Sequence, residues 1–192
     1  MEKMFFSEPQ QRVTVGAYGK VLVLLNERKE KPVGDSMGDE MRDAVVPTEQ
    51  YVYDGCWLDT GGMDSEQALL AAAKASWLSA IEAYDASDSV NAFMLNGQKV
   101  WLDKATRVGL MNSTNIAKAI GQTTTTLWLG EAKLVVDCDK AIQLLSALEM
   151  YALECFNVTA AHKKAVTEMT TLEDVLGYDY TGGYPQKLTM EV

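Results

Sequence analysis

Two glycine-turned strand pairs alternate with two helical segments between Phe93 and Pro185, and this order constrains the fold more than any other feature of the chain. The first pair turns at Asn96-Gly97, which supplies the positive-φ residues that a tight hairpin requires. The second pair, 123–129 and 132–137, is rich in β-branched residues and joins through Gly130-Glu131. The sequence therefore predicts an α+β fold in which short antiparallel β-hairpins pack with two or three amphipathic helices.

Helices are predicted where apolar residues recur at three- and four-residue spacing behind a capping residue. The expected caps are Asp64, Asp103, Asp139 and Thr171. In the helix over 104–120 we expect Val108, Met111 and Ile116 to face inward. The helix that begins at Asp139 should run for about eight turns.

The N-terminal region is predicted to form β-hairpins. One is expected around the turn Gly16-Ala-Tyr-Gly, and another around Asp54-Gly55, a dipeptide typical of type I′ turns. Between them, the apolar residues near 26–47 follow no regular period, so we expect a mobile loop there.

A polar run at 85–89 marks the expected hinge of the chain. The sequence therefore predicts three regions. They are an N-terminal hairpin region (1–62), a connecting helix with a hinge (63–88) and a C-terminal α+β domain (89–192).

The net charge of the chain disfavours two classes of binding partner. Asp and Glu total 27 against 17 Lys and Arg, which gives a formal net charge of -10. Because affinity for nucleic acid or an anionic membrane comes largely from clustered cations, neither is expected as a partner. No apolar run approaches the ~20 residues that cross a bilayer, and Met1–Pro9 does not resemble a secretory signal, so we expect a cytoplasmic start.

Residues that could perform catalysis are few. His162 is the single histidine, and Cys155 lies seven residues before it on the same predicted helix, so a Cys-His pair is geometrically conceivable. Cys56, Cys138 and Cys155 show no metal-binding spacing and are expected to be free thiols, buried or half-buried. The acidic residues at the predicted helix starts are explained by capping, so no catalytic residue, metal or cofactor is expected. The alternative hypothesis is a small ligand-binding protein or enzyme that uses Cys155 and His162.

Aromatic residues suggest where a partner could bind. Trp101 and Trp128 are expected to fill the core between sheet and helix. Tyr178, Tyr180 and Tyr184 crowd around a glycine pair and precede Pro185, which suggests an irregular segment lying across a surface. Together with Trp77 of the connecting helix, these three tyrosines are the candidate partner-binding residues.

Four sequence blocks mark the second half of the chain: Phe93-Met-Leu-Asn-Gly-Gln-Lys-Val-Trp-Leu-Asp-Lys-Ala-Thr-Arg, Thr124-Thr-Thr-Leu-Trp-Leu, Leu148-Glu-Met-Tyr-Ala-Leu-Glu-Cys, and Tyr178-Asp-Tyr with Tyr184-Pro. These blocks resemble a family of phage and prophage domains of unknown function, encoded beside tail-fibre genes or within tail-fibre assembly proteins. The resemblance covers about residues 85–188. The family supplies no catalytic residues.

The resemblance implies a phage tail-associated protein that acts by binding rather than by catalysis. Its expected partner is a tail-fibre or baseplate protein, and homo-oligomerisation stays open. We expect it in the host-cell cytoplasm during assembly, or in the tail of the virion. An assembly chaperone and a structural component of the tail are both compatible with the sequence.

Overall fold

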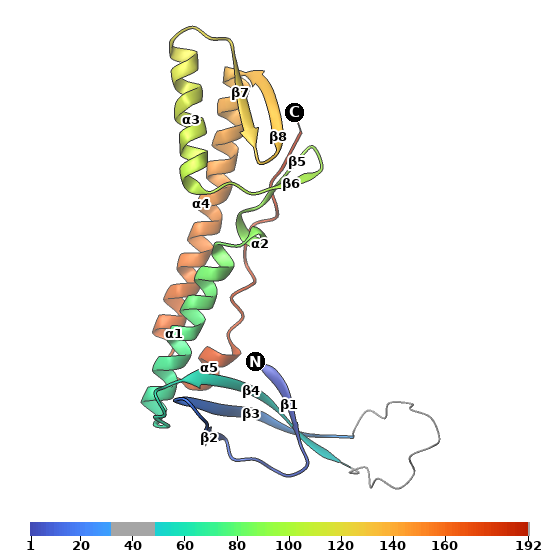
Figure 1. Ribbon diagram of the computed structural model, residues 1–192, viewed down its shortest axis with the longest axis vertical. Coiled ribbons are helices and arrows are strands. Elements are labelled where there is room, and N and C mark those ends of the chain that lie inside the picture. Colours follow the sequence, from blue (N-terminus) through green and yellow to red (C-terminus); the bar gives the residue numbers. More distant parts are fainter. Residues whose placement is uncertain (32–48, 192) are drawn as a thin grey trace, which may run out of the picture. The chain divides into compact units, whose positions relative to one another are not determined.

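The computed structural model describes residues 1–31 and 49–191, which form two compact units (Figure 1). Unit 1 comprises Met1–Trp77 with Glu168–Tyr178, and unit 2 comprises Leu78–Thr167 with Asp179–Val192. The predicted α+β class is confirmed, because helices accompany small, mainly antiparallel sheets. The sequence-based boundaries at 62 and 88 differ from this division, which falls within a single helix, Glu66–Asp85 (α1).

Unit 1 is built on a sheet with the strand order β1-β4-β3-β2. Its strands are β1 (Glu2–Phe6), β2 (Val13–Val15), β3 (Lys20–Glu30) and β4 (Gln50–Asp59). The β2–β3 hairpin confirms the predicted turn at Gly16-Ala-Tyr-Gly. The loop predicted from Asn26 is wrong in its first residues, because β3 continues to Glu30 through a bulge between Leu25 and Arg28. The rest of that predicted loop, from residue 32, lies outside the described residues.

The hairpin predicted at Asp54-Gly55 is also wrong, because β4 runs straight through both residues. Gly55 pairs with Leu24 on one side and with Glu2 on the other, in the middle of the sheet. A Cβ atom at Gly55 would overlap Met4 Sδ and lie 2.8 Å from Met4 Cε. The glycine therefore leaves room for the end of the Met4 side chain and does not form a turn.

We expect Gly55→Ala to destabilise the protein by about 1 kcal/mol or less, because the added methyl has to displace only the flexible end of the Met4 side chain. Alanine suits the backbone there, since Gly55 has no positive φ. In a Met4→Ala background the same substitution should cost little, which a double-mutant cycle of urea denaturation curves will measure. An equal cost in both backgrounds would contradict this explanation.

Both faces of the unit 1 sheet carry buried residues, since Val21, Leu22, Val23 and Leu24 are buried in succession on β3. Val21, Val23, Val52 and Leu58 are almost fully buried, and they share one face of the sheet. The helix α5 (Leu172–Gly177) returns to this unit and buries Leu172, Val175 and Leu176. Its predicted cap is confirmed, because Thr171 Oγ1 accepts a hydrogen bond from Asp174 N at 3.2 Å. The cap predicted at Asp64 is displaced by one residue, since Ser65 Oγ accepts from Ala68 N at 3.4 Å.

Unit 2 contains two hairpins and two long helices. Its elements are α2 (Asp88–Asn91), β5 (Phe93–Leu95), β6 (Gln98–Val100), α3 (Lys104–Ala119), β7 (Thr124–Leu129), β8 (Ala132–Asp137), α4 (Cys138–Glu168, whose last residue belongs to unit 1) and β9 (Thr189–Met190). Both predicted hairpins are confirmed, with Asn96 and Gly97 at φ values of 48° and 79°. The strand β9 adds to β5 in parallel, and α2 replaces part of the expected hinge.

The core of unit 2 gathers around Phe93, Leu127, Leu145 and Tyr151. The Tyr151 hydroxyl donates to the carbonyl of Val90 at 2.7 Å, and burial raises the pKa of Tyr151 to about 12. The hydroxyl therefore remains a protonated donor inside the core. The length predicted for the helix from Asp139 is confirmed by α4, but its cap is Asp137, whose Oδ1 accepts from Asp139 N at 2.8 Å.

Two inward assignments in α3 are wrong, although its predicted cap is confirmed. Asp103 Oδ1 accepts from Thr106 N at 2.8 Å, and the helix begins at the next residue. Val108 and Ile116 are 42% and 61% exposed. The buried positions are Arg107 and Thr114, because polar side chains with internal partners take the inner face of this helix.

The tryptophans predicted for the core are exposed. Trp101 is 43% exposed and Trp128 is 57% exposed. Trp128 lies between Leu127 and Leu129, which are both buried, so strand alternation directs it to the opposite face. In the described ranges, no helix combines the length and the apolar character needed to cross a membrane.

Candidate partner-binding site

A cavity of about 410 Å³ opens on the surface of unit 2. Its walls come from the end of α1, the segment that leads into α3, and one face of α4. Cavities of roughly 300–1,000 Å³ are the usual size of sites for small ligands. The cavity is therefore large enough to be a binding site.

Arg107 and Glu149 form the polar part of this cavity. Arg107 Nε donates to Glu149 Oε1 at 2.9 Å, and Arg107 Nη1 donates to the carbonyl of Leu102 at 2.7 Å. The Arg107 side chain is almost fully buried, while that of Glu149 is about one third exposed. The two hydrogen bonds fix the guanidinium plane against the cavity.

The apolar part of the cavity consists of Trp101, Leu153 and Phe156, which are 43%, 48% and 62% exposed. Glu149, Ala152, Leu153 and Phe156 lie three and four residues apart on α4, so they share one face of the helix. Met150 is also exposed and lies one turn from Leu153. We call Trp101, Met150, Leu153 and Phe156 the exposed apolar surface.

The charged side chains that line the cavity differ in the hydrogen bonds and ion pairs that they form. Asp85 Oδ1 accepts from Thr159 Oγ1 at 2.7 Å. Asp103 accepts two hydrogen bonds from Thr106, which lower the pKa of its carboxyl group. Lys104 forms no ion pair with any described residue. Both aspartates are therefore engaged within unit 2, whereas the Lys104 ammonium has no carboxylate partner among the described residues.

The four residues predicted to bind a partner lie elsewhere, and each is half-buried. In unit 1, Trp77 Nε1 donates to the carbonyl of Tyr178 at 3.1 Å. In unit 2, the rings of Tyr180 and Tyr184 lie 5.9 Å and 5.6 Å from the ring of Tyr84. Each of the four side chains or its backbone is thus engaged within its own unit, and their role in partner binding stays a prediction.

Cys155 and His162 have different partners in unit 2. The Cys155 thiol is fully buried and donates to the carbonyl of Val90 at 3.6 Å. Burial raises the pKa of this thiol, so it stays protonated near neutral pH and is a poor nucleophile. His162 Nε2 donates to the carbonyl of Gly182 at 2.9 Å, and its ring packs against Tyr184. Both residues therefore help to hold the fold of unit 2 together.

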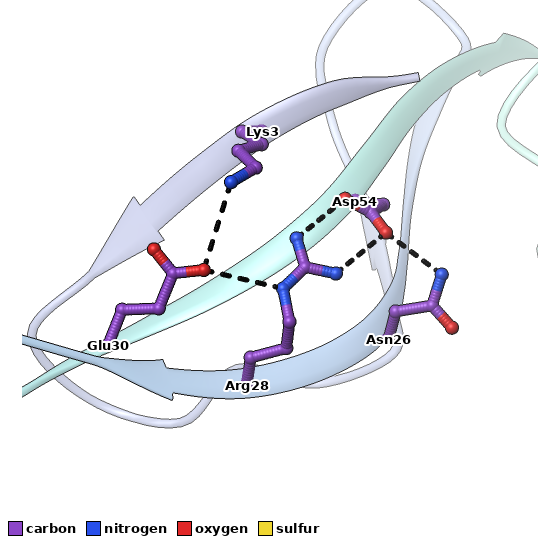
Figure 2. Close-up of polar contacts among 5 residues, drawn as sticks. All are labelled: Lys3, Asn26, Arg28, Glu30 and Asp54. Carbon is purple, nitrogen blue, oxygen red and sulfur yellow. Dashed lines mark hydrogen bonds and ion pairs between the residues drawn. The ribbon is translucent and has the colours of Figure 1, made fainter.

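A second polar cluster lies on the sheet of unit 1, beside the bulge in β3 (Figure 2). Arg28 donates to both carboxylate oxygens of Asp54 at 2.9 Å, and Asn26 Nδ2 donates to Asp54 Oδ2 at 2.9 Å. Glu30 lies 3.6 Å from Arg28 Nε and 3.8 Å from Lys3 Nζ. Hydrogen bonds from Arg28 and then Asn26 lower the pKa of Asp54 to about 2. The cluster joins β1, β3 and β4 across the bulge, which explains it as a stabilising network.

The lowered pKa of Asp54 makes part of the stability depend on pH. The carboxylate is stabilised in the folded state relative to its ordinary pKa of 3.8, so its contribution is present above that value and is lost as the pH falls toward 2. Its side chain is 23% exposed, and solvent screening reduces the contribution to about 1 to 2 kcal/mol.

We therefore expect Asp54→Asn to lower the free energy of unfolding at about pH 7, with the difference from wild type shrinking between about pH 5 and pH 2. Urea denaturation across this range will measure the difference. Asp59→Asn is the matched control, because Asp59 lies exposed on the same strand and forms no ion pair with the described residues. A difference that stays constant with pH would contradict the assignment.

Sequence reasoning misses the cavity because its residues are spread from 85 to 156. One signal is present in the sequence. The helix α4 already buries Leu145, Leu148 and Cys155 in the core. It also carries a second group of apolar residues, Met150, Leu153 and Phe156, which are exposed. A helix that is apolar on more than one side requires a second surface to contact. Within the described residues, no cluster of His, Cys, Asp or Glu could hold a metal ion.

The chain matches no protein-family model, and comparisons with curated proteins and with solved structures give no match.

Proposed function

We propose that the protein is a non-enzymatic, phage tail-associated interaction module that binds its partner through the exposed apolar surface of unit 2. The observation that carries the binding role is the gathering of Trp101, Leu153 and Phe156 around a cavity, with Met150 exposed one helical turn from Leu153. Exposed apolar groups of this kind are typical of protein interaction sites, where aromatic residues and methionine are enriched. The phage setting is supported by the four resembling sequence blocks.

The resembling blocks and the exposed apolar surface overlap in the sequence. The first block, 93–107, contains Trp101 and Arg107, and the third block, 148–155, contains Glu149, Met150 and Leu153. These blocks lie far apart in the chain and meet at the cavity. This overlap supports a binding role for the surface in a tail-associated protein.

The side chains of unit 2 favour binding over catalysis. Arg107 and Glu149 bond each other, and the thiol of Cys155 is buried and protonated. A general base or nucleophile has to be free to exchange a proton or attack a substrate. Groups engaged in this way are better suited to orienting a bound partner. The protein would act in the host-cell cytoplasm during tail assembly, or as a component of the tail.

A pull-down with phage tail-fibre and baseplate proteins, the partners that the resemblance implies, will test the proposal. Wild type should retain one of them, and Phe156→Asp should weaken that retention by about tenfold or more, since truncating a central interface residue typically costs over 1 kcal/mol. Ile116→Asp is the matched control, because Ile116 is equally exposed but lies on α3, outside the cavity. Retention of none of these proteins by wild type, or equal loss in both variants, would refute the proposal. Mass spectrometry of purified particles will separate a chaperone from a tail component.

A further inference from the structure

We propose that the cavity binds a large apolar side chain from a neutral or basic segment of a partner polypeptide, with the main chain of that segment hydrogen-bonded to Arg107 and Glu149. This inference rests on the proposed function, because it specifies which part of the partner occupies the exposed apolar surface. Three features of the cavity support it: its apolar walls, its unused hydrogen-bonding groups and its charge.

The apolar walls suit a side chain rather than a flat surface. Trp101 and Phe156 present exposed rings and Leu153 an exposed aliphatic group to a cavity of about 410 Å³. A large apolar side chain that enters this volume would remove its own surface and that of three apolar residues from water. Such an anchored side chain is the usual centre of an interface.

Arg107 keeps an unused donor at the cavity. Its Nε and Nη1 atoms are hydrogen-bonded, whereas Nη2 forms no hydrogen bond with the described residues. In the described part of the chain, Thr60 Oγ1 is the one fully enclosed side-chain nitrogen or oxygen atom without a partner, so Arg107 Nη2 is not completely enclosed. Since Arg107 lines the cavity, its free N–H groups are available to a carbonyl oxygen that enters.

Glu149 supplies an acceptor next to that donor. Its Oε1 atom accepts from Arg107 Nε, whereas its Oε2 atom has no partner among the described residues. A peptide group presents one carbonyl acceptor and one N–H donor, which complement Arg107 Nη2 and Glu149 Oε2 respectively. The polar part of the cavity is therefore matched to a main chain.

The charge around the cavity opposes an acidic ligand. Its lining contains Asp85, Asp103 and Glu149 against Lys104 and Arg107, a formal net charge of -1. The whole chain carries -10. A partner segment with acidic residues next to its apolar side chain would be repelled, whereas a neutral or basic one would be attracted.

The test is an NMR titration of the full chain with two blocked peptides. The first is acetyl-Ser-Lys-Trp-Leu-Lys-Ser-amide, and the second has glutamate in place of both lysines. We expect the lysine peptide to shift the amide signals of Trp101, Arg107, Glu149 and Leu153, and to bind at least about fivefold more tightly than the glutamate peptide, because like charges disfavour the latter. Phe156→Ser should weaken binding of the lysine peptide by about tenfold, while Ile116→Ser should leave it unchanged.

Three results would overturn the inference: no shifts at the cavity, equal affinity for the two peptides, or equal weakening by Phe156→Ser and Ile116→Ser. Leu153→Ser replaces Phe156→Ser if the latter loses the dispersed spectrum of a folded chain. Peptide binding at the cavity without retention of a tail protein would refute the proposed function alone. Retention of a tail protein that depends on Phe156, without binding of the lysine peptide, would refute this inference alone.

Discussion

Replacing Phe93 with alanine is expected to lower the free energy of unfolding by about 3 to 5 kcal/mol. Phe93 is fully buried at the start of β5, in the core cluster that also contains Leu127, Leu145 and Tyr151. Alanine would remove the ring from its apolar surroundings and leave a cavity that this packed core cannot fill by collapsing. Urea denaturation, followed by circular dichroism and by the amide signals of unit 2, will measure the loss.

Phe156→Ala is the matched control for this prediction, because it makes the same chemical change at an exposed position. Phe156 lies on α4 and alanine favours a helix, so we expect a change within about 1 kcal/mol. Similar losses for the two variants would contradict the assignment of Phe93 to the core and of Phe156 to the surface.

Replacing Arg107 with alanine is expected to destabilise the protein by about 3 kcal/mol, because it removes one partner of a largely buried ion pair. The substitution leaves the carbonyl of Leu102 and the carboxylate of Glu149 without their donor. Glu149 is partly exposed and can be rehydrated, which keeps the cost at the lower end of the range for buried pairs. Thermal and urea denaturation will measure it.

Glu149→Gln provides the comparison for Arg107. Glutamine keeps a carbonyl oxygen that can accept from Arg107 Nε, and Arg107 keeps its hydrogen bond to Leu102, so we expect a loss of about 1 kcal/mol or less. If Glu149→Gln lowers the free energy of unfolding as much as Arg107→Ala does, the stabilisation comes from the charge of the Arg107–Glu149 pair. The hydrogen bond from Arg107 to the carbonyl of Leu102 would then contribute little.

Local signals explain which elements of the fold can be predicted from the sequence. The turns at Asn96-Gly97 and Gly130-Glu131, and the caps Asp103 and Thr171, depend on residues next to one another in the chain, and all are confirmed. The strands β1 and β9 escape prediction, because each is short and pairs with a strand far away in the sequence. The second half of β3, from Asn26, also escapes prediction, because the bulge between Leu25 and Arg28 interrupts the alternation that identifies a strand.

Long-range packing explains the errors. Asp54-Gly55 carries a turn signal, yet both residues lie in the middle of β4, where the Met4 side chain of a neighbouring strand packs against Gly55. The size of Trp128 favours the core, but strand alternation gives the inner face to its neighbours. The cavity has no local signature, since it forms only when Trp101, Arg107 and the outer face of α4 meet. Burial and partner choice of this kind are decided by tertiary contacts rather than by local pattern.

The most direct test of the binding site is site-specific photo-crosslinking in cells that express the chain together with the phage tail proteins proposed as its partners. A benzophenone amino acid is placed at position 156, and in a parallel strain at position 116, both exposed in the isolated chain. We predict that the probe at 156 crosslinks to one tail-fibre or baseplate protein, whereas the probe at 116 does not. Crosslinking from 116 but not from 156, or no crosslink to a tail protein from either position, would contradict the claim that the exposed apolar surface of unit 2 is the binding site.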